Sequence, residues 1–75
     1  MNTGYSVELK PSGRGNAYRD QGNLKRAISD YNEGIRLAPK WGFAYKSRGL
    51  AYLRAGERDK AYADFATMRR LQSDQ

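Results

Sequence analysis

An internal repeat constrains this chain more than any other feature of its sequence. Arg14-Gly15 recurs as Arg48-Gly49, which places the two copies 34 residues apart. At the same shift the sequence also aligns Ala17 with Ala51, Tyr18 with Tyr52, Gly22 with Gly56, Ala27 with Ala61, Asp30 with Asp64, Tyr31 with Phe65, Arg36 with Arg70 and Leu37 with Leu71. Small and aromatic residues at fixed phases of such a period are typical of stacked helical hairpins, so the sequence predicts an all-α fold.

Turn-forming residues divide the sequence into four predicted helices. The first is expected to begin at Ser12 or Gly13 and to end at about Gln21, after which Gly22 allows a turn with positive φ. Pro39 ends the second helix, since proline cannot continue one. The expected bounds of the three later helices are 24–38, 43–55 and 58–72.

Size and composition exclude several classes of function. A chain of 75 residues forms one small domain, whose core is marginal without disulfides, a metal or a partner. It has no cysteine and no histidine, which removes disulfides, thiolate metal sites and the commonest general base. The carboxylates are scattered, and Arg26 four residues before Asp30 predicts surface ion pairing for Asp30 and Glu33. We therefore expect no enzyme, no cofactor and no metal site.

The net charge is positive and evenly spread. The 14 basic and 8 acidic residues give +6, without a dense run of Lys or Arg. This balance favours acidic partners in a general way, and binding of nucleic acid or another polyanion is an alternative, which steep salt dependence would reveal. No apolar run approaches the roughly 20 residues that span a bilayer, and the N-terminus lacks a secretion signal, so a cytoplasmic location is the default expectation.

The repeated residues resemble the tetratricopeptide repeat (TPR) family. In the first copy the matches are Gly15, Tyr18, Ala27, Tyr31 and Pro39, and in the second they are Tyr45, Gly49, Tyr52, Ala61 and Phe65. The resemblance implies two antiparallel helix-turn-helix hairpins stacked as a short α-solenoid. The core that it implies consists of Gly15, Tyr18, Ala27, Tyr31, Gly49, Tyr52, Ala61 and Phe65.

The same resemblance sets the expected domain bounds. Residues 1–11 show no helical period and are expected to form a flexible leader, followed by the repeat domain at 12–75. The repeats are expected at about 8–41 and 42–75. Pro11 stands where the first helix of the family carries its large anchor, so the first hairpin is expected to be truncated.

The family resemblance further implies a concave groove that receives an extended peptide or a helix of another protein. The residues at groove positions are Asn16, Arg19, Phe43, Lys46, Leu50, Leu53 and Arg54. Asn16, Lys46 and Arg54 have the residue types with which one subset of the family clamps a peptide's C-terminal carboxylate. Alternatively, the polar residues are merely solvated beside an apolar strip of Phe43, Leu50 and Leu53, which could still anchor a peptide or helix.

Self-association is expected through the uncovered last helix, the truncated first hairpin, or both. Two hairpins are fewer than the three or so that a stack of this kind needs, and Arg69 takes the place that Ile35 holds in the first copy. Tyr62, Met68 and Leu71 are the candidate contact residues, with a dimer as the expected assembly. Trp41 is expected either to cover the joint between hairpins or to be an exposed contact residue. A further alternative is a fragment of, or an engineered piece from, a longer repeat array.

Overall fold

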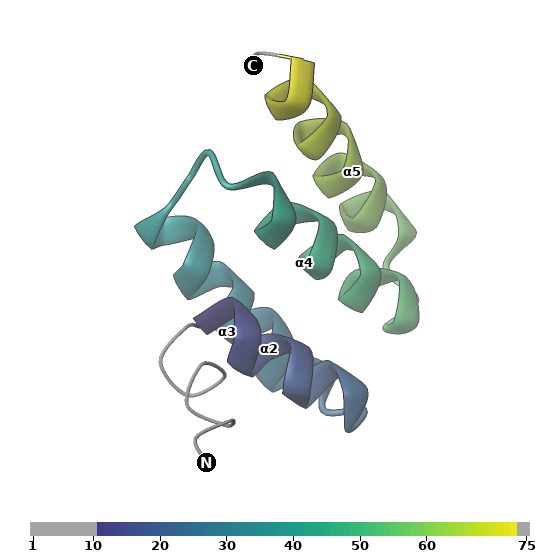
Figure 1. The fold of residues 1–75 in the computed structure, drawn as a ribbon. Helices are drawn as coiled ribbons and strands as arrows, with labels where there is room; N and C mark the ends of the chain where they lie inside the picture. Colours follow the sequence, from purple (N-terminus) through teal and green to yellow (C-terminus); the bar gives the residue numbers. More distant parts are fainter. Residues whose placement is uncertain (1–10, 74–75) are drawn as a thin grey trace.

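The computed structural model describes residues 11–73, which form four α-helices joined by short turns (Figure 1). The helices are α2 (Pro11–Asp20), α3 (Leu24–Leu37), α4 (Gly42–Arg54) and α5 (Arg58–Ser73). They form two antiparallel hairpins, α2 with α3 and α4 with α5, as the sequence predicts. The predicted leader lies outside the described residues apart from Pro11, and so do the last two residues.

The helix boundaries follow from capping and turn residues. Helix α2 begins at Pro11, one residue before the earliest predicted start, because a proline in the first turn needs no N–H partner and already has a helical φ. Gly22 and Gly56 take φ values of 84° and 82° and turn the chain within each hairpin. The side chain of Asn23 accepts a hydrogen bond from the Arg26 backbone N–H (3.3 Å) and thereby caps the start of α3.

Helix α4 is central to the described part of the chain. It packs against α5 and also against α3 and α2, whereas α5 contacts α4 alone among the described helices (Figure 1). The second hairpin therefore stacks on the first through α4, which makes a short α-solenoid. One long side of α5 is left without a neighbour from residues 11–73. No helix in this range is both long enough and apolar enough to pass through a membrane.

The core is built from small residues and one large ring. Its centre is Ala27, Tyr31 and Ala51, all fully buried. A Cβ added to Gly15 would lie 2.8 Å from Cε1 of Tyr31, so the absence of a side chain lets the ring pack directly on the backbone of α2. Of the predicted core residues, Gly15, Ala27, Tyr31, Gly49 and Ala61 are buried, and Tyr18, Tyr52 and Phe65 are half-buried.

An arginine on the first helix of each hairpin pairs with an aspartate on the second. Nε of Arg14 donates to Asp30 Oδ2 at 3.0 Å, and Nε of Arg48 donates to Asp64 Oδ2 at 2.8 Å. The repeat shift relates the two pairs, residue for residue. Each pair therefore joins the two helices of its hairpin, at equivalent positions of the two repeats.

Both carboxylates of α3 form ion pairs, as predicted, but Asp30 has another partner than the predicted Arg26. Asp30 binds Arg14 of the neighbouring helix, while the Arg26 guanidinium donates to the Tyr18 hydroxyl at 3.2 Å. Glu33 pairs with Arg36 within α3, and this hydrogen bond lowers the pKa of the Glu33 carboxyl group. The predicted partner of Asp30 was wrong because spacing along the sequence relates neighbours within one helix, whereas the hairpin brings Arg14 of α2 across to Asp30.

The Arg48–Asp64 pair is the more buried of the two and joins three helices. Asp64 is 4% exposed, and its Oδ1 accepts a second bond from Arg48 Nη2 at 2.6 Å. Nη1 of Arg48 also donates to Asn32 Oδ1 on α3 at 2.8 Å. Cζ of Arg48 lies 5.7 Å from the ring centroids of both Tyr45 and Tyr52. The bond to Asp64 raises the pKa of the Arg48 guanidinium group.

Replacing Arg48 by methionine is expected to destabilise the fold by about 2–3 kcal/mol, because Asp64 would keep a buried carboxylate without its partner. The measurement is the free energy of unfolding, from urea denaturation followed by helical circular dichroism. Arg14→Met is the matched control, and it should cost clearly less because the Arg14 side chain is 45% exposed. If the two variants lost equal amounts of the free energy of unfolding, the special role of Arg48 would be contradicted.

Candidate protein-binding surface

Helix α4 has its small residues inside and its large apolar residues outside. Ala44, Ser47 and Ala51 are buried. The exposed apolar residues are Phe43 (46%), Leu50 (37%) and Leu53 (38%). An amphipathic surface helix normally turns its large apolar residues toward the core. The reversed pattern in α4 leaves large apolar side chains in contact with solvent.

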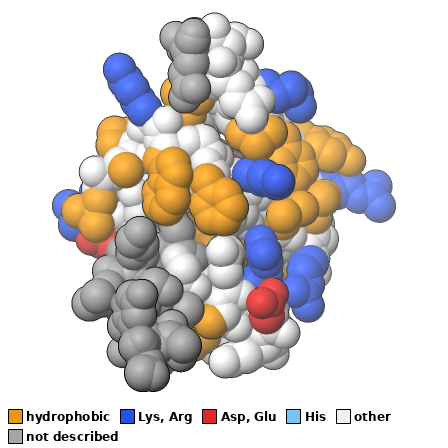
Figure 2. Space-filling view, in the orientation of Figure 1, with side chains coloured by type: hydrophobic (Ala, Val, Ile, Leu, Met, Phe, Trp, Pro, Cys, Tyr) orange, Lys and Arg blue, Asp and Glu red, His pale blue; other side chains and the backbone are white. Residues whose placement is uncertain are grey.

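These side chains form one stripe, which we call the α4 strip: Trp41, Phe43, Lys46, Leu50 and Leu53. From Phe43 onward its members follow one another at spacings of three or four residues, so they lie along one side of the helix. Figure 2 shows hydrophobic side chains gathered in the middle of this face, with Lys and Arg side chains beside them. Contiguous exposed apolar side chains of this kind mark interaction sites.

Trp41 extends the strip beyond the start of α4. It occupies the N-cap position with an extended backbone, and its ring centroid lies 5.6 Å from that of Phe43, with 33° between the ring planes. The side chain is 42% exposed. Of the two roles predicted for Trp41, this geometry therefore fits the exposed contact residue.

Three of the predicted groove residues make contacts that hold the helices together. Asn16 accepts a hydrogen bond from the Tyr31 hydroxyl, and Arg19 donates to the Ser47 carbonyl at 3.5 Å. Arg54 donates to the Arg19 carbonyl, in the last turn of α2, at 2.8 Å. These contacts tie α2 to α3 and to α4. Asn16, Arg19 and Arg54 therefore already have partners within the fold.

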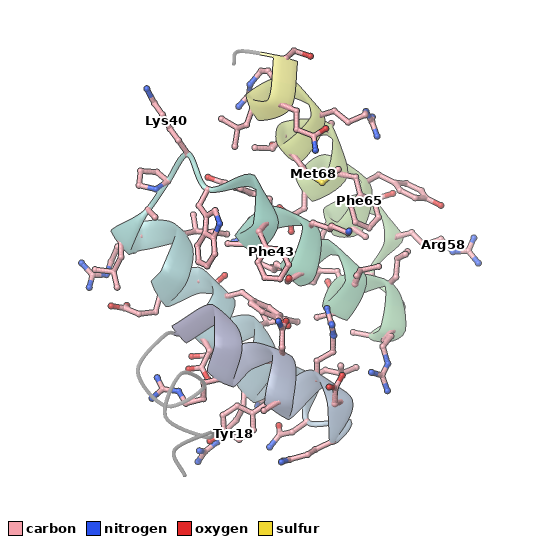
Figure 3. All side chains as sticks on the ribbon, viewed as in Figure 1. Tyr18, Lys40, Phe43, Arg58, Phe65 and Met68 are labelled. Carbon is pink, nitrogen blue, oxygen red and sulfur yellow. The ribbon has the colours of Figure 1, made fainter. Side chains whose placement is uncertain are left out.

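Lys46 lies beside a hollow between α4 and α5. None of the ion pairs among residues 11–73 includes Lys46. The hollow, which we call the α4–α5 hollow, has a volume of about 360 Å³ and is lined by Trp41, Gly42, Phe43, Lys46, Met68, Leu71 and Gln72. Figure 3 shows Phe43 on α4 and Met68 on α5. Asn16 and Arg54 do not line it, so this hollow does not unite the three predicted clamp residues.

The sequence patterns assign Met68 and Leu71 to self-association and do not predict that these residues form the far wall of this hollow with Gln72. Leu71 and Gln72 follow Met68 by three and by four residues, so the three residues share one side of α5. This spacing, which can be read from the sequence, shows which residues lie on one side of α5. It does not show which helix that side contacts, because the contact depends on the angle at which α5 crosses α4.

The three residues predicted for self-association do not share a face of α5. Leu71 follows Tyr62 by nine residues, roughly two and a half turns, which places the two on opposite sides of the helix. Met68 and Leu71 line the α4–α5 hollow, and Met68 Cγ lies 3.6 Å from the position that a Cβ on Gly42 would take. Tyr62 is 58% exposed and does not line the hollow.

The free side of α5 can be located by comparison with α3. In α3, Leu24 and Ile28 pack against the core centre that includes Ala51 of α4. The repeat shift places Arg58, Tyr62 and Arg69 at the positions of Leu24, Ile28 and Ile35. We call these three residues of α5 the α5 outer face, and all of them are exposed.

The chemistry of these surfaces is that of binding. Within residues 11–73, no three Asp, Glu, His or Cys side chains gather in a way that could hold a metal ion. A hollow of about 700 Å³ opens to solvent around residues 56–60 at the α4–α5 turn, where most lining side chains are charged. The α4 strip and the α4–α5 hollow combine apolar side chains with a lysine, a combination that suits a segment of another protein.

The comparison with known families agrees with this geometry. The family model described as TPR repeat matches residues 15–56, from within α2 to the turn that follows α4. No solved structure was found to match the chain. The family match covers more than half of the 75 residues and includes the contact between the two hairpins. The 34-residue period, the paired helices and this match together show that the chain belongs to the TPR repeat family.

Proposed function

We propose that the α4 strip binds an extended segment or a helix of another protein. The observation that carries the proposal is the reversed pattern of α4, in which Phe43, Leu50 and Leu53 face solvent while alanines and a serine are buried. TPR repeats are generally protein-interaction modules, which supports a binding role for such a surface. An apolar stripe along one helix matches the way in which grooves of helical proteins receive peptides or helices.

Apolar contact would drive this binding and charge would direct it. Fully burying one large apolar side chain contributes about 1.5–3 kcal/mol, and a few such anchors dominate most interfaces. Lys46 lies within the strip, and the chain carries a net charge of +6. Both features favour a segment that has Asp or Glu beside its apolar anchors.

Peptides selected from a random displayed library on the immobilised protein are expected to depend on the α4 strip. Leu53→Ser should weaken their affinity by about tenfold, because the substitution removes a buried apolar contact from the complex. Leu37→Ser is the matched control, since Leu37 is 60% exposed and lies at the end of α3, outside the strip. Titration calorimetry measures the affinities once circular dichroism has shown that both variants fold.

The result that overturns this proposal is specific. The proposal fails if the selected peptides bind with unchanged affinity to each of three variants, Leu50→Ser, Leu53→Ser and Phe43→Ser. Such peptides would bind elsewhere on the protein. A selection that enriches no peptide for the wild-type protein would count against the strip as a peptide site as well.

We also propose that copies of the chain associate through the α5 outer face. At these positions α3 carries Leu24 and Ile28, which pack against the core centre that includes Ala51 of the neighbouring hairpin. In α5 the corresponding face has no neighbour among the described helices, and it exposes 58% of Tyr62. Exposed tyrosines are among the residues that contribute most to protein interfaces.

The α3–α4 contact within the chain indicates the geometry of such an association. In such an association, α2 of a second copy would pack against α5 of the first copy as α4 packs against α3. Asp20 of the second copy would then occupy the position that Arg54 has in the α3–α4 contact. Arg58 of the first copy, at the position of Leu24, would then lie near that Asp20. Opposite charges favour this arrangement. The contact is head-to-tail, so two copies form a pair that leaves the same two faces open at its ends.

Sedimentation velocity over a concentration series is expected to show an average mass that rises above that of one chain. Arg58→Glu should weaken the association, because it places like charges together, and adding Asp20→Arg should restore it by reversing the pair. Leu37→Ser serves as the neutral control. One monomeric species at every concentration would contradict self-association, and a charge reversal without rescue would contradict the head-to-tail geometry.

A further inference from the structure

The α4–α5 hollow has the shape of a pocket for one large side chain. Trp41 and Phe43 form one wall, and Met68 and Leu71 form the other. Its volume of about 360 Å³ is near the lower limit of pockets that hold whole small molecules. A hollow of this size that opens on a protein surface therefore suits a single aromatic or large aliphatic side chain.

The chemistry of the walls favours an aromatic ring. Aromatic rings pack against one another in tilted or offset arrangements, as Trp41 and Phe43 already do at 5.6 Å. Met68 adds a flexible thioether, which makes favourable contacts with aromatic rings and adapts to their shape. An incoming ring would thus find an aromatic surface on one side and a methionine sulfur on the other.

The rim of the hollow carries positive charge. Lys46 lines it, and no carboxylate is among the lining residues. Lys46 takes part in none of the ion pairs among residues 11–73. Gln72 adds an amide group to the same rim. An acidic residue next to the inserted ring would be attracted to this rim.

Two of the side chains that line this hollow are not repeated in the first copy of the sequence. The repeat shift places Gly34 at the position of Met68 and Ser12 at the position of Lys46. Gly34 is buried and has no side chain with which to build a wall. The pocket chemistry is therefore a property of the second hairpin and does not follow from the shared repeat.

We infer that the α4–α5 hollow receives an aromatic side chain from an acidic peptide segment, with Lys46 contacting the adjacent carboxylate. This inference rests on the proposed binding by the α4 strip, whose first members also line the hollow. It adds the class of residue that is recognised and the contribution of α5. The partner is a protein segment in which a Phe, Tyr or Trp has Asp or Glu as its neighbour.

The sole tryptophan of the chain, Trp41, reports on this site by its fluorescence. The probe is a capped peptide, Gly-Ser-Asp-Phe-Asp-Ser-Gly, titrated into the full chain. A saturable change in Trp41 emission is expected. Replacing the probe's Phe by Ala should weaken its affinity by about tenfold or more, since the ring is the buried group. Replacing both Asp by Asn should weaken it by about threefold.

Two variants test the walls and the rim. Leu71→Ser should lower the affinity for the probe by about tenfold, because the substitution removes part of the apolar wall. Lys46 is exposed, so Lys46→Gln should not affect folding. This variant should lower the affinity for the acidic probe by about threefold and leave the affinity for the probe with Asn in place of Asp unchanged. Leu53→Ser is the control, since Leu53 belongs to the α4 strip but does not line the hollow.

The outcomes separate this inference from the proposed function. If the probe does not bind, or binds equally to Leu71→Ser and to wild type, the hollow is not the site and the inference fails. Library-selected peptides that still lose affinity in Leu53→Ser would then keep the proposed function intact. If neither the probe nor any selected peptide binds, both proposals fail.

Discussion

The arrangement of the helices depends on one half-buried guanidinium group. Arg48 of α4 binds Asp64 of α5 through two hydrogen bonds and Asn32 of α3 through a third, and it lies near the rings of Tyr45 and Tyr52. A planar fork of donors holds its partners in a defined geometry. The apolar core around it is small, so this cross-link contributes to the way in which the second hairpin sits on the first.

The small core has a direct consequence for the surface. Close packing of α4 against its neighbours requires alanine, serine and glycine at the contacts, which leaves the large apolar residues of α4 no place inside. They face solvent on the opposite side and form the α4 strip. The small residues that let the helices pack closely thus also account for the exposed apolar surface on which the proposed binding rests. In this fold stability and binding use opposite sides of one helix.

The two proposed contacts use different sides of the second hairpin. The α4 strip lies along α4 and the hollow lies between α4 and α5, whereas the α5 outer face lies where a further hairpin would stack. Tyr62 and Leu71 stand on opposite sides of α5, so one helix contributes to both surfaces without sharing residues between them. A partner segment and a second copy could therefore bind at the same time. The TPR repeat supplies the stacking geometry. Met68 and Lys46, which line the hollow, have no equivalent side chain in the first copy of the repeat.

The sequence by itself determined the helices, the turns between them and the pairing into hairpins. These follow from local rules: Gly22 and Gly56 allow positive φ, Pro39 stops a helix, and a repeated pattern requires repeated units. The tertiary structure decided which side chains meet across helices. Asp30 pairs with Arg14 rather than Arg26, and Met68 lines a hollow with Trp41, because these contacts depend on the angles at which helices cross. Side-chain spacing along one helix carries no information about those angles.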